Sequence, residues 1–204
     1  MAWMGQWLWE NYSWIQQIPI VCRVAWWLIM KTGMKYAMII RNRQDLVRLF
    51  PLSQAIKRGE KIYALWLSGL GVLDNMPLDE RRSIKQVIFP SPDCSSLGDL
   101  AHYVDTAKGY IFADMKQKIT TATILAHAAN TEVRYWHNFP GMSLTFGNPM
   151  ESNGWLQIEL LLPQVEPGER TTLRIEKKDN NELFVEYWEI YRRIWEKSTL
   201  PPTP

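Results

Sequence analysis

The sequence predicts a mixed α/β domain with helices on both faces of one sheet, preceded by Trp-rich helices at the N-terminus. Two nearly continuous apolar runs, at residues 61–67 and 84–89, have strand length and are typical of strands buried on both faces. A series of shorter strands separated by Gly-, Asn- and Pro-rich turns follows in the second half of the chain. Segments with a helical spacing of apolar residues lie between and after these strands.

Size and composition indicate an ordinary globular protein. The chain has 204 residues, 47% of them hydrophobic and 22% charged, enough for one compact domain and an appendage. Its net charge of +2 is too small to indicate a nucleic-acid partner, which usually requires a concentrated basic face. The cysteines, Cys22 and Cys94, are isolated and predict neither a disulfide framework nor a zinc site. We therefore expect a cytoplasmic protein without a metal or another cofactor.

Tryptophan is concentrated at the start of the chain, and we interpret residues 1–34 as a separate helical segment. Six of the eleven tryptophans lie in the first 27 residues. Trp3, Trp7 and Trp14 recur at intervals of four and seven, the spacing of one helix face. The residues expected to contact a membrane or a partner are Trp3, Trp7, Trp14, Trp26 and Trp27.

Two interpretations of this segment stay open. The first is association with the inner face of a membrane, because tryptophan favours the membrane–water interface. The apolar run at 18–30 would cover only about 20 Å as a helix, against a hydrocarbon core of ~30 Å, which favours a surface helix or a short span. The second is packing on the rest of the domain or on a second copy of the chain. Both interpretations make this segment the site of association.

The main domain, residues 35–198, opens with a short strand at 36–40. Asp45 is a candidate N-cap for the next helix, and Gly59 is a candidate stop. Pro51 lies inside this helix and predicts either a kink or two short helices.

The first buried strand, 61–67, ends in a loop of small residues at 68–71. The second, 84–89, is closed by Pro90, because proline cannot donate to a strand ladder. Helical spacing then predicts a short helix at 96–104 and a long one at 108–129.

Four strands and a helix complete the predicted domain. The strands are expected at 131–136, 142–146, 155–161 and 172–176. Asn180 or Asn181 is the candidate cap of a final helix that runs to Lys197, with Phe184, Trp188 and Trp195 among its apolar residues. Residues 199–204 are expected to be a disordered tail.

In element order and local pattern, this chain resembles one module of the phospholipase D-like superfamily, over residues 35–198. The resemblance is carried by the strand at 62–67, the Pro-Ser-Pro-Asp turn at 90–93, and the long helix before the strand at 132–136. The closing helix, which ends Ile-Trp-Glu-Lys-Ser at 194–198, is similar to the end of degenerate modules in bacterial proteins. The resemblance implies the fold of that superfamily.

The superfamily's catalytic strand carries His-x-Lys-x-x-x-x-Asp, and this sequence differs from it at all three positions. Gly141, Ser143 and Asn148 stand at that spacing. In the family the His attacks phosphorus, while the Lys and the Asn or Asp hold the phosphate. The resemblance therefore implies a fold retained without its nucleophile, which favours a non-catalytic binding or sensing module over an enzyme.

The same resemblance implies a relic phosphate pocket that would take an anionic small ligand. Its candidate residues are Ser68, His137, Ser143, Asn148 and Glu159. Ser68 begins the loop of small residues after a strand, and His137 precedes the altered motif. For Glu159 in mid-strand, the alternation of the sequence also allows a solvent-exposed side chain.

Two other functions stay open. A phosphodiesterase or other hydrolase would use reassigned residues such as His137 and Glu159 as an acid–base pair. A membrane-associated interaction scaffold would need no small ligand. His102 and Asp105, three positions apart, suit either a metal or acid–base pair or an exposed contact. An enzyme predicts titratable groups that converge in one cleft, whereas a sensor predicts a polar pocket without a nucleophile.

Overall fold

The computed structural model describes residues 37–94, 112–138, 141–161, 165 and 168–202. Its strands are β1 (Met38–Ile40), β2 (Ile62–Leu65), β3 (Ile84–Pro90), β4 (Glu132–Trp136), β5 (Met142–Gly147), β6 (Trp155–Leu160) and β7 (Thr172–Glu176). Its helices are α3 (Arg43–Leu49), α4 (Leu52–Lys57), α5 (Leu70–Leu73), α6 (Leu78–Arg81), α8 (Phe112–Ala128) and α9 (Asn181–Lys197). The strands form one mixed sheet in the order β1-β7-β6-β5-β2-β3-β4.

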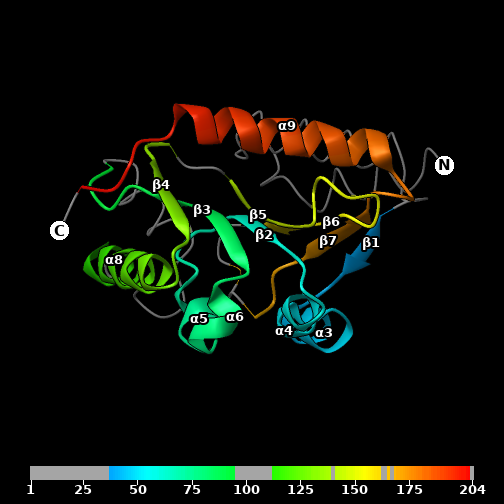
Figure 1. Cartoon of the computed structure of the whole chain (residues 1–204), viewed down its shortest axis with the longest axis horizontal. Coiled ribbons are helices and arrows are strands. Elements are labelled where there is room, and N and C mark those ends of the chain that lie inside the picture. The colour runs from blue at the N-terminus through cyan, green and yellow to red at the C-terminus, as the bar shows by residue number, and fades with distance from the viewer. Residues whose placement is uncertain (1–36, 95–111, 139–140, 162–164, 166–167, 203–204) are drawn as a thin grey trace, which may run out of the picture. The chain divides into compact units, whose positions relative to one another are not determined.

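Helices cover both faces of this sheet. In Figure 1, α9 lies on one face, and α3, α4, α5, α6 and α8 lie on the other. The predicted fold class, a mixed α/β sheet with helices on both faces, is therefore confirmed.

The sheet has a parallel half and an antiparallel half. β2, β3 and β4 are parallel neighbours, so the chain must cross over between them, through α5 and α6 and through a segment that includes α8. β5, β6, β7 and β1 pair in antiparallel fashion. The continuous apolar runs of β2 and β3 are typical of strands buried on both faces. In this parallel half of the sheet, Ile62, Val87 and Ile88 are fully buried.

Helix α9 forms its layer with one apolar face. Asn180 caps the helix, and its side chain accepts a hydrogen bond from the Leu183 N–H at 3.1 Å. The Phe146 ring of β5 lies 5.1 Å from the Trp188 ring and 5.6 Å from the Tyr191 ring, measured between centroids. The buried residues of the helix are Leu183, Phe184, Tyr187, Trp188 and Tyr191. The predicted final helix and its cap are confirmed.

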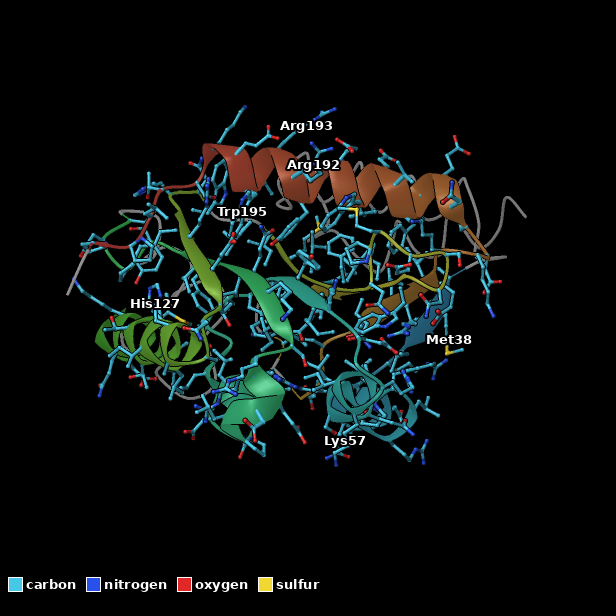
Figure 2. All side chains as sticks on the ribbon, in the orientation of Figure 1. Met38, Lys57, His127, Arg192, Arg193 and Trp195 are labelled. Carbon is cyan, nitrogen blue, oxygen red and sulfur yellow. The ribbon has the colours of Figure 1, made fainter. Side chains whose placement is uncertain are left out.

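The C-terminal end of α9 is only partly buried. In Figure 2, Trp195 lies on the side of the helix that faces the sheet, and Arg193 lies on the outer side. Trp195 is half-buried rather than buried, and the Arg134 guanidinium lies 4.6 Å from the centroid of its ring. The predicted packing of Trp195 is thus a contact at the rim of the core.

Two short helices connect β1 to β2, which was one of the two predicted outcomes at Pro51. Proline has no N–H to donate and disfavours helical backbone in the preceding residue, and Phe50 leaves the helical region at φ −138°. The predicted cap at Asp45 is wrong. The cap is Asn42, three residues earlier, and its side chain accepts a hydrogen bond from the Asp45 N–H at 2.8 Å.

The turn after β2 differs from the predicted loop because α5 begins within it, at Leu70. Gly69 has a φ of 63°, which favours glycine, and a Cβ there would lie 2.5 Å from Cε3 of Trp66. The end of the chain also differs from the prediction. Thr199, expected in a disordered tail, exchanges two backbone hydrogen bonds with Tyr135 of β4, at 2.7 and 3.0 Å.

Several predicted features lie outside the described residues. They are the Trp-rich segment at 1–34 with its five contact tryptophans, the short helix at 96–104, and the His102–Asp105 pair. Of the helices in the described ranges, none combines the length and apolar character needed to cross a membrane.

Candidate functional site

Three neighbouring strands present polar side chains on the face that α3 covers. Register places Ser143, Glu159 and Thr172 side by side across β5, β6 and β7. A parallel row, two residues along each strand, consists of Thr145, Gln157 and Arg174. Directly paired residues have Cβ atoms about 4.5–5.5 Å apart, so each row forms a continuous polar strip. Leu144, Ile158 and Leu173, which alternate with them, are apolar and buried on the α9 face.

A cavity of about 250 Å³, which we name the Arg170 cavity, lies over these strips. Helix α3 and the turn after it line one side of the cavity, and the turn after β2 and helix α8 line another. The described lining residues are Arg43, Leu46, Val47, Phe50, Leu52, Trp66, Leu67, Ser68, Gly69, Gly71, Val72, Met115, Lys118, Ser143, Thr145, Gln157, Glu159, Arg170 and Thr172.

Positive charge predominates in the described lining of the Arg170 cavity. Arg43, Lys118 and Arg170 are the cationic residues, and Glu159 is the carboxylate. The Arg170 side chain is only 5% exposed and donates a hydrogen bond to Glu159 Oε1 at 2.8 Å. Its Nε is buried without a hydrogen-bond partner. Lys118 is paired with Asp114 at 2.6 Å, outside the lining.

The turn after β2 shapes the wall beside this charge. The Trp66 indole N–H donates a hydrogen bond to Thr145 Oγ1 at 2.8 Å, which ties the ring to the strand floor. Gly69 follows with its left-handed backbone and lets the chain pass over the same ring. Ser68, between these two residues, is thereby held at the cavity wall.

Three of the five predicted pocket residues line this one cavity: Ser68, Ser143 and Glu159. Asn148 does not line it. Its side chain accepts a hydrogen bond from the Lys61 N–H at 2.8 Å, and its backbone has a φ of 46°, so it shapes the turn after β5.

His137 lies elsewhere in the fold. It follows β4, is exposed, and has its Nε2 3.1 Å from Thr199 Oγ1. Three strands separate β4 from β6, which carries Glu159. At the usual spacing of about 4.8 Å between strands, the two residues are roughly 19 Å apart across the sheet. The structure does not bring His137 and Glu159 into one cavity.

Sequence reasoning missed the cations of the cavity. Arg170 stands just before β7, two positions from the residue that pairs with Glu159. Its contact with Glu159 becomes visible only when the pairing of β6 with β7 is known. Arg43 and Lys118 lie on helices whose sequences give no sign that these faces converge.

A second cavity, of about 370 Å³, lies along the same sheet face, and we name it the Arg174 cavity. Phe50 and Leu52 line both cavities. The other lining residues are Leu49, Pro51, Gln54, Ala55, Arg58, Glu60, Asn153, Trp155, Arg174 and Glu176. Within the described ranges, no group of three or more His, Cys, Asp or Glu residues is arranged to hold a metal ion.

Comparisons with known proteins give a structural neighbour. No family model and no curated protein matches the sequence. The structure is similar to the crystal structure of a phospholipase D family member, Nuc from Salmonella typhimurium, with a TM-score of 0.49 and 9% sequence identity. The match covers 82% of this chain and 98% of that chain. At this identity the similarity concerns the fold alone.

Proposed function

We propose that this domain is a non-catalytic binding or sensing module that holds the anionic group of a small ligand in the Arg170 cavity. The observation that carries the proposal is the burial of the Arg170 guanidinium in a cavity where three cationic side chains stand against one carboxylate. A charge in such a partly buried site is screened less than one at the surface, so an anion there gains more Coulomb energy.

An oxyanion such as phosphate fits the donors that line the cavity. Arginine offers several N–H donors in a planar arrangement that suits phosphate. The hydroxyls of Ser68, Ser143 and Thr172 add uncharged donors near the same floor. The cavity volume, about 250 Å³, is suited to a small molecule or to the charged end of a larger one.

Binding without hydrolysis is the simplest use of these groups. The described lining contains no histidine and no cysteine. At the spacing of the superfamily's motif, Gly141 supplies no side chain and Ser143 supplies no positive charge. The alternative hydrolase would pair His137 with Glu159, and the two lie on different parts of the sheet.

Titration of the full-length protein with inorganic phosphate at constant ionic strength tests the proposal. We expect saturable binding to the wild type, because the cavity offers charged donors. Arg170→Lys keeps the charge but loses the planar arrangement of donors and should weaken binding by about 1.5–3 kcal/mol, the usual value for a hydrogen bond to a charged group. Arg192→Lys, on the exposed surface of α9, is the matched control and should bind like the wild type.

Three results would contradict the proposal. Equal phosphate affinity of the wild type and Arg170→Lys would place the anion outside this cavity. Turnover of a generic phosphodiester by the wild type, abolished in His137→Ala, would instead support the hydrolase. Absence of any phosphate binding would favour the interaction scaffold.

A further inference from the structure

A second arginine, Arg174 on β7, has its guanidinium over two aromatic rings. Its guanidinium carbon lies 4.0 Å from the centroid of the Trp155 ring and 4.8 Å from that of Phe50. Contacts of this kind stabilise a cation over the face of a ring and restrict the orientation of the guanidinium plane. The Arg174 side chain is 7% exposed, and its Nε donates a hydrogen bond to Glu176 Oε1 at 2.8 Å.

The terminal nitrogens of Arg174 are available to a ligand. The described residues provide no hydrogen-bond acceptor for Nη1 or Nη2, and neither atom is fully buried. A guanidinium has five N–H donors, so four of those of Arg174 are unused by the protein. The residue lines a cavity of about 370 Å³, which gives these donors room for an acceptor.

The other charges in the Arg174 cavity are already paired. Glu60 accepts hydrogen bonds from the Trp155 indole N–H and from Arg58 Nε, the latter at 2.8 Å. Glu176 is paired with Arg174 itself. Two guanidinium groups and two carboxylates therefore line the cavity. The lining carries no net charge, so burying a doubly charged anion such as phosphate costs more there than burying a singly charged one.

Burial lowers the pKa of the Arg174 guanidinium from its ordinary value, while the charge and hydrogen bond of Glu176 raise it. The group is still charged at neutral pH. Its surroundings thus stabilise the positive charge less well than water does, and an added anion would offset this deficit.

We propose that the Arg174 cavity binds the carboxylate of a small molecule. The two carboxylate oxygens accept parallel hydrogen bonds from the guanidinium, whose plane is held by Trp155 and Phe50. The remainder of the molecule lies beside Gln54 and Asn153, whose amides supply further polar contacts. This inference is independent of the function proposed for the Arg170 cavity, because it concerns other donors and another class of anion.

Indole N–H signals in the ¹H–¹⁵N spectrum of the full-length protein can test the inference. Trp155 reports on the Arg174 cavity and Trp66 on the Arg170 cavity, and Trp155→Phe and Trp66→Phe assign the two signals. Acetate is the probe, added at constant ionic strength in exchange for chloride. We expect a shift of the Trp155 signal that saturates with acetate. The acetate affinity measured from this shift should be at least about tenfold lower in Arg174→Lys, which keeps the charge but loses the paired donors.

Arg170→Lys is the matched control and should leave the acetate response of Trp155 unchanged. Phosphate should shift the Trp66 signal, so failure of either cavity is seen separately. If Arg174→Lys does not fold, Phe50→Leu replaces it. This change should weaken the acetate response because it removes one of the two rings that the guanidinium contacts. A Trp155 shift that does not saturate with acetate would overturn the inference. An acetate affinity in the Arg174 and Phe50 variants equal to that of the wild type would also overturn it.

Discussion

At the scale of single residues, two buried tyrosines differ in what their hydroxyl groups contact. The Tyr135 hydroxyl lies 3.0 Å from Thr123 Oγ1, and the two share a hydrogen bond. The Tyr191 hydroxyl is buried without a partner, beneath α9. A buried polar group without a hydrogen bond destabilises the fold, whereas a paired one contributes a modest net stabilisation.

We therefore expect opposite effects from the same substitution at the two positions. Tyr191→Phe should leave the free energy of unfolding unchanged or raise it, because it removes the unpaired hydroxyl and keeps the ring contacts with Phe146 and Trp188. Tyr135→Phe should lower it by about 1 kcal/mol, the usual net value of a hydrogen bond. Urea unfolding monitored by circular dichroism measures both. A loss at Tyr191 as large as that at Tyr135 would show that its hydroxyl has a partner.

The free energies of unfolding of the same two variants should differ more at alkaline pH. Burial raises the pKa of the Tyr191 hydroxyl well above its ordinary value of 10.0, with smaller effects from Tyr63 and Glu132. Above pH 10.0 the unfolded chain loses this proton while the folded chain keeps it. The unfolded state then binds fewer protons, so the free energy of unfolding falls as the pH rises. Tyr191→Phe should unfold with a shallower pH dependence in that range.

The candidate site shows which residues a sequence can identify. Ser143 could be found because a family motif fixes its position, and Glu159 because it lies in the adjacent strand. Arg170 and Arg174 could not, since their importance depends on which strands pair and on which rings lie above them. Asn148 was predicted from the same motif, yet its amide is used by the backbone of Lys61.

At the scale of elements, α3 and α9 form for different reasons. α9 buries five residues against the sheet, so tertiary packing stabilises it. α3 has seven residues, none of them buried, and forms one wall of the Arg170 cavity. A helix this short depends on its cap, which is the Asn42 side chain.

Removal of each helix cap should therefore have a different effect. Asn42→Ala should cost about 0.5–2 kcal/mol locally, seen as faster hydrogen exchange of the Phe50 amide, which is bonded to Leu46 in the last turn of α3. Global unfolding should hardly change. Asn180→Ala is the comparison, and it should lower global stability because α9 is part of the core. Equal effects of the two changes on global unfolding would show that α3 is more firmly packed than its burial indicates.

Local sequence predicted the elements better than their boundaries. The strands could be predicted because short apolar runs between turn residues usually form buried strands. The start of α3 was misplaced because Asn42 and Asp45 are both good caps, and only the backbone conformation decides between them. The residues at 68–71 look like a plain loop, but the left-handed Gly69 allows α5 to begin inside it.

At the scale of the whole molecule, the sequence predicted the layers and left the strand order undetermined. Alternation along β5, β6 and β7 sorts polar residues to one face and apolar residues to the other. The pairing of β5 with both β2 and β6 depends on contacts distant in the sequence, which no local pattern encodes. A polar face could also have been read as a solvent face, as it was for Glu159.

The N-terminal residues should determine how the molecule associates. We expect that deletion of residues 1–32 leaves a folded, soluble domain, because every described strand and helix lies beyond them. The full chain should bind lipid vesicles or form oligomers, since six tryptophans in 27 residues make a large apolar surface. Vesicle flotation and light scattering of both forms measure this.

The two readouts separate the open interpretations of this segment. Flotation of the full chain, lost on deletion, would support membrane association. Multimers without flotation would support self-association. A full chain that stays monomeric and free of lipid would contradict both.

The wall formed by Phe50 and Leu52 belongs to both cavities and lies at the joint between α3 and α4. A ligand that displaces this wall in one cavity must alter the space offered by the other. Thermodynamic linkage then requires reciprocity: the factor by which phosphate changes the affinity for acetate equals the factor by which acetate changes the affinity for phosphate. Displacement of Phe50 or Leu52 by a ligand in one cavity would thus be felt as a change of affinity in the other.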